Sequence, residues 1–169
     1  MPPVSLLLSL LGLIPFVIGG LAALGHNPEP ADRALMVLID YAALVLAFAG
    51  GIHWGLALGG TLPTTVDLAG NPASPVTTPP RMSRRIVLGV MPLLIGWAAL
   101  LLAQIIATWM ALVLLIAGYL ATMIIEHEAR RRVAYPARYL WLRWAFTIVA
   151  VAMLTTALIL RLFGQTIVF

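Results

Sequence analysis

The chain has 169 residues, of which 62% are hydrophobic and 9% are charged, and its mean hydropathy is +1.04. Soluble domains carry about 25% charged residues, so this chain has too few charges to cover a water-facing surface and its natural solvent is lipid. It contains neither cysteine nor lysine, which excludes disulfides, thiolate metal sites, cysteine nucleophiles and Schiff-base or P-loop lysines. The net charge of +4 is typical of arginine-rich cytoplasmic loops, and we expect no nucleic-acid binding.

Apolar stretches in chain order predict a single all-α domain, a polytopic membrane bundle of five transmembrane helices. The first span, residues 4–24, has no basic residue before it, so we interpret it as a retained helix rather than a signal peptide. The second span, residues 35–59, follows a short polar turn with helix-starting residues. Residues 60–85 form a proline-rich loop with no core-forming pattern.

The next apolar stretch is too long for one membrane helix. Residues 86–125 run for 40 residues without a charge, and one helix of that length would measure about 60 Å, twice the hydrocarbon thickness of about 30 Å. Gln104 is the least apolar point, with Thr108 and Trp109 nearby, so we predict a hairpin at residues 103–108 between spans at 86–102 and 109–125. The fifth span is predicted at residues 141–162.

The arginines divide unevenly between the two ends of the predicted bundle. Seven fall in residues 81–85 and 130–138 on one side, whereas only Arg33 and Arg161 fall on the other. Arginine-rich loops stay in the cytoplasm, so we predict an N-terminus inside and a C-terminus outside. A solvated basic end that sets the orientation is the favoured interpretation, and a patch for anionic lipids or phosphate is the alternative. The patch consists of Arg84, Arg85, Arg130, Arg131, Arg132 and Arg138.

The second span contains a strip of small residues. Ala47, Gly51, Gly55 and Gly59 recur every four residues and therefore lie on one helix face. Such strips let helix backbones approach closely in lipid. Helix packing within the protein is the favoured interpretation, and a homodimer seam or a ligand groove are the alternatives.

An aspartate and a histidine also lie in this span. A carboxylate within a span is costly and usually has a partner. We therefore expect Asp40 to cap the helix or to bond Tyr41 or Arg33, with a proton or cation site as the alternative. His53 lies about 20 Å from Asp40 along the axis, so the two cannot pair. A neutral histidine bonded to a neighbouring helix is favoured over a ligand or proton-relay role for His53.

A second group of polar residues is predicted near the cytoplasmic leaflet. Glu126 and His127 end the fourth span at a depth similar to that of His53, and Glu126 is also spaced for an ion pair with Arg130. A mostly apolar pocket with a few polar groups fits a lipid, a quinone or a small hydrophobic ligand. The residues that could complete it are Trp54, Tyr119, Tyr139 and Arg143.

Catalytic motifs are absent from the sequence. It has no hydrolase elbow, no zinc-protease motif, no Walker loop and no dinucleotide fingerprint. Its three histidines lack metal-site spacing, so we predict no catalytic residues, no metal and no cofactor. Two histidines at one depth would also be compatible with haem, but nothing else in the sequence supports haem.

Three segments together resemble a known family. They are Tyr41 to Leu58, with Gly50-Gly51-Ile52-His53-Trp54-Gly55 at the centre, Met91-Pro92 followed by Gly96-Trp97, and Tyr139-Leu140-Trp141-Leu142-Arg143 leading to Thr147. The chain is similar, over about residues 13–160, to an uncharacterised family of small multi-span proteins of bacterial inner membranes, with relatives named transmembrane protein 69. The resemblance implies a multi-span fold and an inner-membrane location, and it contributes no activity.

Three functions are consistent with these observations. The favoured one is a non-enzymatic accessory or assembly component of a larger inner-membrane complex. The second is a small oligomeric carrier or channel that uses Asp40, His53 and Glu126 as titrating groups. The third is an enzyme acting on a lipid or quinone, which requires His53 and Glu126 within hydrogen-bond reach. The expected partners are the lipid bilayer and either a larger complex or further copies of the chain.

Overall fold

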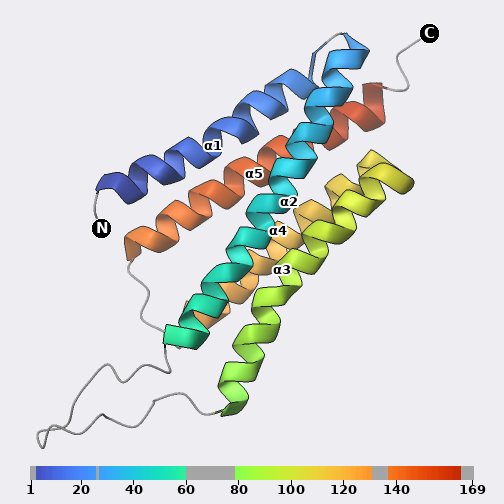
Figure 1. The fold of residues 1–169 in the computed structure, drawn as a ribbon. Coiled ribbons are helices and arrows are strands. Elements are labelled where there is room, and N and C mark those ends of the chain that lie inside the picture. The colour runs from blue at the N-terminus through green and yellow to red at the C-terminus, as the bar shows by residue number, and fades with distance from the viewer. Residues whose placement is uncertain (1–2, 26, 60–78, 131–136, 165–169) are drawn as a thin grey trace, which may run out of the picture.

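The described residues of the chain form five helices in a computed structural model, the number that the sequence predicts. The structure describes the backbone of residues 3–25, 27–59, 79–130 and 137–164, and the side chains of residues 10–25, 27–51, 86–127 and 141–163. The helices are α1 (Pro3–Ala23), α2 (Pro28–Gly59), α3 (Pro79–Ile105), α4 (Thr108–Arg130) and α5 (Ala137–Gly164) (Figure 1).

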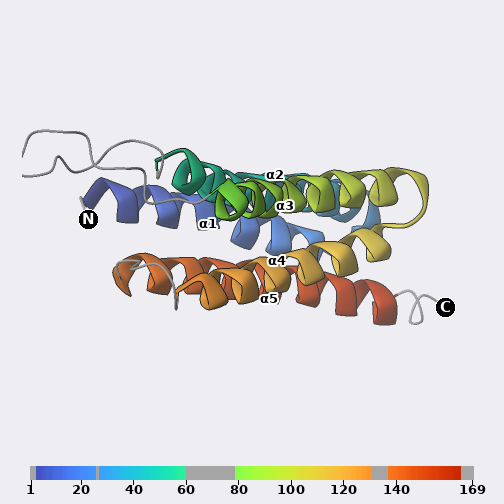
Figure 2. The ribbon, with the colours of Figure 1, turned by 90° about the horizontal axis from the view of Figure 1, so that it is seen from below.

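The helix α2 occupies the centre of the bundle. It packs against α1, α3 and α4. The helix α3 also packs against α4, and α5 packs against both α4 and α1. Figure 2 shows two layers, with α2 and α3 in one and α4 and α5 in the other. Successive helices run antiparallel, so the start of α1 and the end of α5 lie at opposite ends of the bundle (Figure 1).

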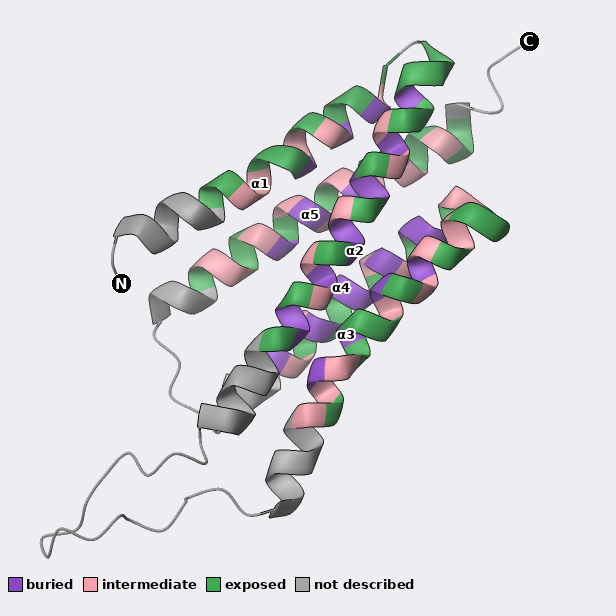
Figure 3. Cartoon of the chain, in the orientation of Figure 1, coloured by how far each residue is buried: buried purple, intermediate pink, exposed green. Residues whose placement is uncertain are grey.

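Four helices contain segments long and apolar enough to cross a membrane. Among the described residues these are Pro28–Gly51, Ile86–Ile105, Thr108–His127 and Trp141–Phe163. The helix α1 has 21 residues, and its described part, Leu10–Ala23, is apolar as well. Every helix has exposed large apolar side chains among its described residues, and exposed residues lie along all five helices (Figure 3). The chain is therefore a multi-pass membrane protein.

The connection between α3 and α4 is a tight hairpin. The helix α3 ends at Ile105 and α4 begins at Thr108, so the turn lies within the predicted range of residues 103–108. The amides of Ile106 and Ala107 both bond the carbonyl of Leu102, at 3.0 and 2.9 Å. These bonds satisfy a carbonyl at the helix end that would otherwise lack a partner in lipid.

The helices α2 and α3 each begin seven residues before the predicted spans. The helix α2 begins at Pro28 rather than at residue 35, because its first turn is polar but helical. Glu29 in that turn accepts a hydrogen bond from Arg33 of the next turn at 2.6 Å, with i,i+4 spacing. The helix α3 begins at Pro79, inside the predicted loop, and the remainder of that loop, residues 60–78, is outside the described residues.

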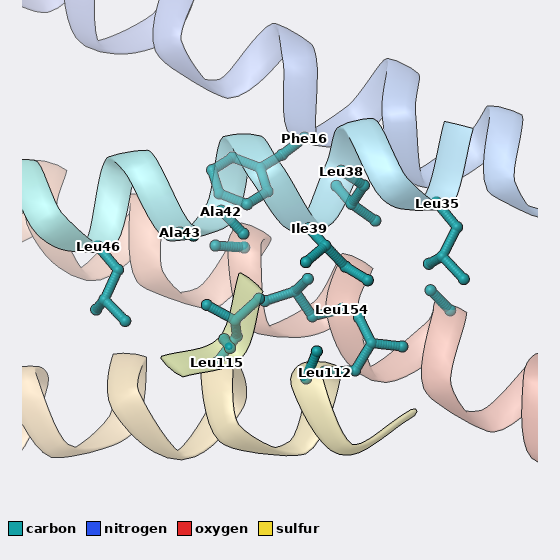
Figure 4. Close-up of a cluster of buried hydrophobic side chains, with 14 of the residues drawn as sticks. Phe16, Leu35, Leu38, Ile39, Ala42, Ala43, Leu46, Leu112, Leu115 and Leu154 are labelled. Carbon is teal, nitrogen blue, oxygen red and sulfur yellow. The ribbon is translucent and has the colours of Figure 1, made fainter. Parts of the chain in front are cut away.

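The core is built around one aromatic ring. Phe16 of α1 is fully buried and makes edge-to-face contacts with Tyr41, Tyr119 and Phe146, with ring centroids 5.1, 6.2 and 5.6 Å apart. The four rings come from four different helices. In lipid, shape complementarity of this kind holds helices together. Around Phe16 lie buried aliphatic side chains, among them Leu38, Ile39, Leu46, Leu112, Leu115 and Leu154 (Figure 4).

Glycines allow α2 and α3 to meet backbone against backbone. A Cβ at Gly50 would overlap the carbonyl oxygen of Gly89, and one at Gly96 would lie 2.8 Å from the carbonyl oxygen of Ala43. Gly51 of the predicted strip does not make this contact. A Cβ at Gly51 meets nothing within 4 Å, and Gly51 is exposed. Ala47 is half-buried, and the strip's last members, Gly55 and Gly59, lie beyond the described side chains.

Candidate functional site

Among the described residues, two ion pairs between helices lie near opposite ends of the bundle. Arg143 of α5 pairs with Glu126 of α4, and Arg161 of α5 pairs with Asp32 of α2. The two arginines are 18 residues apart, which corresponds to about 27 Å of helix, close to the hydrocarbon thickness of about 30 Å. The exposed ring of Trp141 lies near the first pair, as expected for an aromatic belt at a membrane interface.

The first candidate site is at the end of the bundle that carries most arginines. The Nε of Arg143 donates to both carboxylate oxygens of Glu126, at 3.2 and 3.0 Å. The rings of His127 and Trp144 form a second contact between α4 and α5, with centroids 6.0 Å apart. Beside it is a shallow, mostly apolar groove of about 190 Å³, lined by Met123, Ile124, His127 and Trp144.

The structure therefore brings together three residues of the predicted pocket, Glu126, His127 and Arg143. Glu126 has Arg143 as its partner across the helix interface, whereas the prediction offered Arg130 one turn along the same helix. Tyr119 lies two turns deeper and is fully buried, and its hydroxyl donates to the carbonyl of Ala42 at 2.9 Å. The Tyr119 hydroxyl thus acts in helix packing.

The remaining predicted members of this site are placed only by their helices. His53 and Trp54 belong to the last turns of α2, and Tyr139 belongs to the first turn of α5. Their side chains lie outside the described residues. Among the side chains that are described, no three His, Asp or Glu residues converge as metal ligands would.

The predicted lipid patch is distributed over three helix ends at the same end of the bundle. Arg84 and Arg85 lie in the first two turns of α3, Arg130 is the last residue of α4, and Arg138 is near the start of α5. Arg131 and Arg132 lie outside the described residues. The backbone positions are compatible with a basic rim at one membrane surface.

The second candidate site is Asp40 on α2. The exposed residues that recur every three or four positions along α2 form one side of the helix, which we call the outer face of α2. Asp40 is exposed in the middle of this face, and the apolar side chains next to it are strongly exposed, at 66% for Leu44 and 78% for Phe48. The outer face consists of Arg33, Val37, Asp40, Leu44, Phe48 and Gly51.

Asp40 lies well inside the apolar thickness of the bundle. It follows Asp32, the partner of Arg161, by eight residues, which places it about 12 Å further along the helix. It is also two residues from Ala42, whose carbonyl bonds Tyr119 in the buried core. An aspartate at such a depth costs about 2.5–3.5 kcal/mol on insertion scales, so its exposure to the outside of the bundle is unusual.

Tyr41 and Arg33, the expected partners of Asp40, form hydrogen bonds with other residues. The hydroxyl of Tyr41 donates to the carbonyl of Gly12 at 2.7 Å, and Arg33 bonds Glu29. The prediction that Asp40 bonds one of these two, or caps the helix, is therefore wrong, because Asp40 is in the middle of α2 and points outward. The sequence did not reveal this face, since apolar residues surround Asp40 on all sides of the helix.

Comparison with known proteins gives a family but no activity. A family described as "Protein of unknown function (DUF3429)" matches residues 1–159, which is nearly the whole chain. No curated protein and no solved structure matches the chain.

Proposed function

We propose that this chain, which belongs to the DUF3429 family, is a non-enzymatic accessory subunit that binds another membrane protein in the bacterial inner membrane. The observation that supports this function is the exposed carboxylate of Asp40 on the outer face of α2. Carboxylates inside spans normally face a bundle interior or a partner group. Among the described residues Asp40 faces neither the bundle interior nor a partner group, so a second protein is the natural source of its partner.

The proposal includes an orientation. We place α1 as a fifth span and the arginine-rich end of the bundle in the cytoplasm, which puts the N-terminus inside and the C-terminus outside. The bias of seven arginines to two supports this orientation, because basic residues flanking spans are retained on the cytoplasmic side.

The accessory function accounts for the carboxylates better than a carrier does. A carrier that uses Asp40, His53 and Glu126 needs them along one water-accessible path. Asp40 is on the outer face of α2, whereas Glu126 is buried between α4 and α5 and bonded to Arg143. The enzyme alternative is also less well supported, because the carboxylate that it needs as a base is engaged in that ion pair.

Native mass spectrometry after gentle extraction from the producing cell tests the proposal. We expect the chain in a complex of fixed stoichiometry with a different membrane polypeptide. The substitution Asp40→Leu should abolish the complex, while Gln104→Leu, which removes an exposed polar side chain from α3, should leave it intact. A lone chain or a homo-oligomer in all three samples would overturn the proposal.

A further inference from the structure

We infer that the partner covers the outer face of α2 with a transmembrane helix that carries one arginine or lysine at the depth of Asp40. This inference rests on the proposed function and adds to it the chemistry of the partner. It follows from the shape of the face, from the charge of Asp40 and from the positions of the cations in the chain.

The shape of the face fits a single helix. Its central members Val37, Asp40, Leu44 and Phe48 are all exposed and follow the i, i+3, i+4 spacing of one helix face. Phe48 follows Val37 by 11 residues, which is about 16 Å along the helix, or three turns. At the end of this stretch the exposed Gly51 has no atom within 4 Å of its Cβ position, so a partner backbone can approach closely there.

The charge of the face identifies what the partner must supply. A carboxylate in hydrocarbon is stabilised by a cation or a strong hydrogen-bond donor at the same depth. The described arginines are already paired, since Arg33 bonds Glu29, Arg143 bonds Glu126 and Arg161 bonds Asp32. The sequence has no other arginine or lysine between residues 34 and 80, 86 and 129, or 144 and 160, so no basic residue of the chain belongs to a span at that depth.

A second copy of the chain does not fit this requirement. Two copies in one membrane share an orientation, so a symmetric contact through the outer face of α2 would place one Asp40 opposite the other. Like charges in a low-dielectric environment repel. The cation must therefore come from a different protein.

Designed transmembrane peptides provide the probe. The peptides are helices of leucine and alanine with a single arginine, lysine or leucine at the centre. The full chain carries one fluorophore at the substitution Asn27→Cys, and this site is unique because the chain has no cysteine. Förster transfer between this fluorophore and one on the peptide is measured in vesicles of phosphatidylethanolamine and phosphatidylglycerol. We expect the arginine and lysine peptides to bind at least tenfold more tightly than the leucine peptide. The preference should disappear in Asp40→Leu and persist in Gln104→Leu.

Equal binding of all three peptides to the unsubstituted chain would overturn the inference. So would Asp40-dependent energy transfer between two labelled copies of the chain, which would assign the face to self-association. These outcomes are separable from failure of the proposed function. A native complex that depends on Asp40, found together with equal peptide binding, would preserve the accessory function and remove only the basic residue of the partner.

Discussion

Arg143 of α5 holds Glu126 of α4 through a single nitrogen, its Nε, which donates to both carboxylate oxygens at 3.0 and 3.2 Å. The side chains are only 13% and 11% exposed. The next residues on the two helices, His127 and Trp144, are also in contact, with their rings edge to face. These two adjacent contacts fasten α4 to α5 at the arginine-rich end of the bundle.

Removal of one member of this ion pair should destabilise the protein. Glu126→Met leaves the Arg143 guanidinium unpaired in a poorly hydrated position, and we expect a loss of about 3 kcal/mol. The double substitution Glu126→Met with Arg143→Met should recover most of that loss. The measurement is unfolding by SDS in mixed micelles. Glu29→Met breaks the exposed pair with Arg33 and should change stability little, and equal effects at residues 29 and 126 would contradict this account.

Substitution by alanine should have opposite effects on stability at Gly50 and Gly51, which are adjacent in α2. A Cβ at Gly50 overlaps the carbonyl of Gly89 in α3, whereas a Cβ at Gly51 meets open space. Gly50→Ala should therefore force α2 and α3 apart and cost about 2 kcal/mol or more. Gly51→Ala should be neutral or slightly stabilising, because alanine favours helix. The same SDS titration distinguishes them, and a larger loss at Gly51 would show that the small-residue strip is the packing face.

The hydroxyl of Tyr119 should have a small but measurable effect on stability. Tyr119→Phe keeps the ring against Phe16 but leaves the Ala42 carbonyl without its side-chain donor at 2.9 Å. Hydrogen bonds between membrane helices contribute about 0.6–1.7 kcal/mol, and we expect a loss in that range. Tyr119→Ala should cost about 3–5 kcal/mol, because it also leaves a cavity. Equal losses from the two substitutions would contradict the packing role of the ring.

Single-cysteine labelling tests the orientation. The chain has no cysteine, so Asn27→Cys, between α1 and α2, and Ser74→Cys, between α2 and α3, each introduce one thiol. In intact cells with a permeable outer membrane, a membrane-impermeant maleimide should label residue 27 and spare residue 74. The reverse pattern would invert the proposed topology, and labelling of both would show that α2 does not cross the membrane.

Lengths and charges were enough to predict the helices. The 40 uncharged residues from 86 to 125 exceed one bilayer thickness, so a turn was required, and Gln104 located it within two residues of the observed Ile106–Ala107 turn. Helix starts were less predictable. The start of α2 is polar but helical and contains the exposed Glu29–Arg33 pair at i,i+4 spacing, and hydropathy does not detect a polar helix start.

Contacts between helices could not be predicted in the same way. At Gly50 and Gly51 the sequence offers two adjacent glycines, and one residue corresponds to a rotation of about 100°, so the packing face was ambiguous. Glu126 had a basic residue one turn away on its own helix and another on α5, and only the three-dimensional arrangement selects Arg143. Asp40 was recognisable as unusual, but its outward direction depends on where α1, α3 and α4 cover α2.

The most direct test of the accessory function is photo-crosslinking in the living cell from the outer face of α2. A photoreactive phenylalanine analogue replaces Leu44, which is 66% exposed beside Asp40, or Ile148 on α5, which is 58% exposed. We expect position 44 to capture one different membrane polypeptide, with the product lost when Asp40→Leu is added, and position 148 to capture none. Capture of only a second copy of the chain at position 44, or equal products at both positions, would contradict the account.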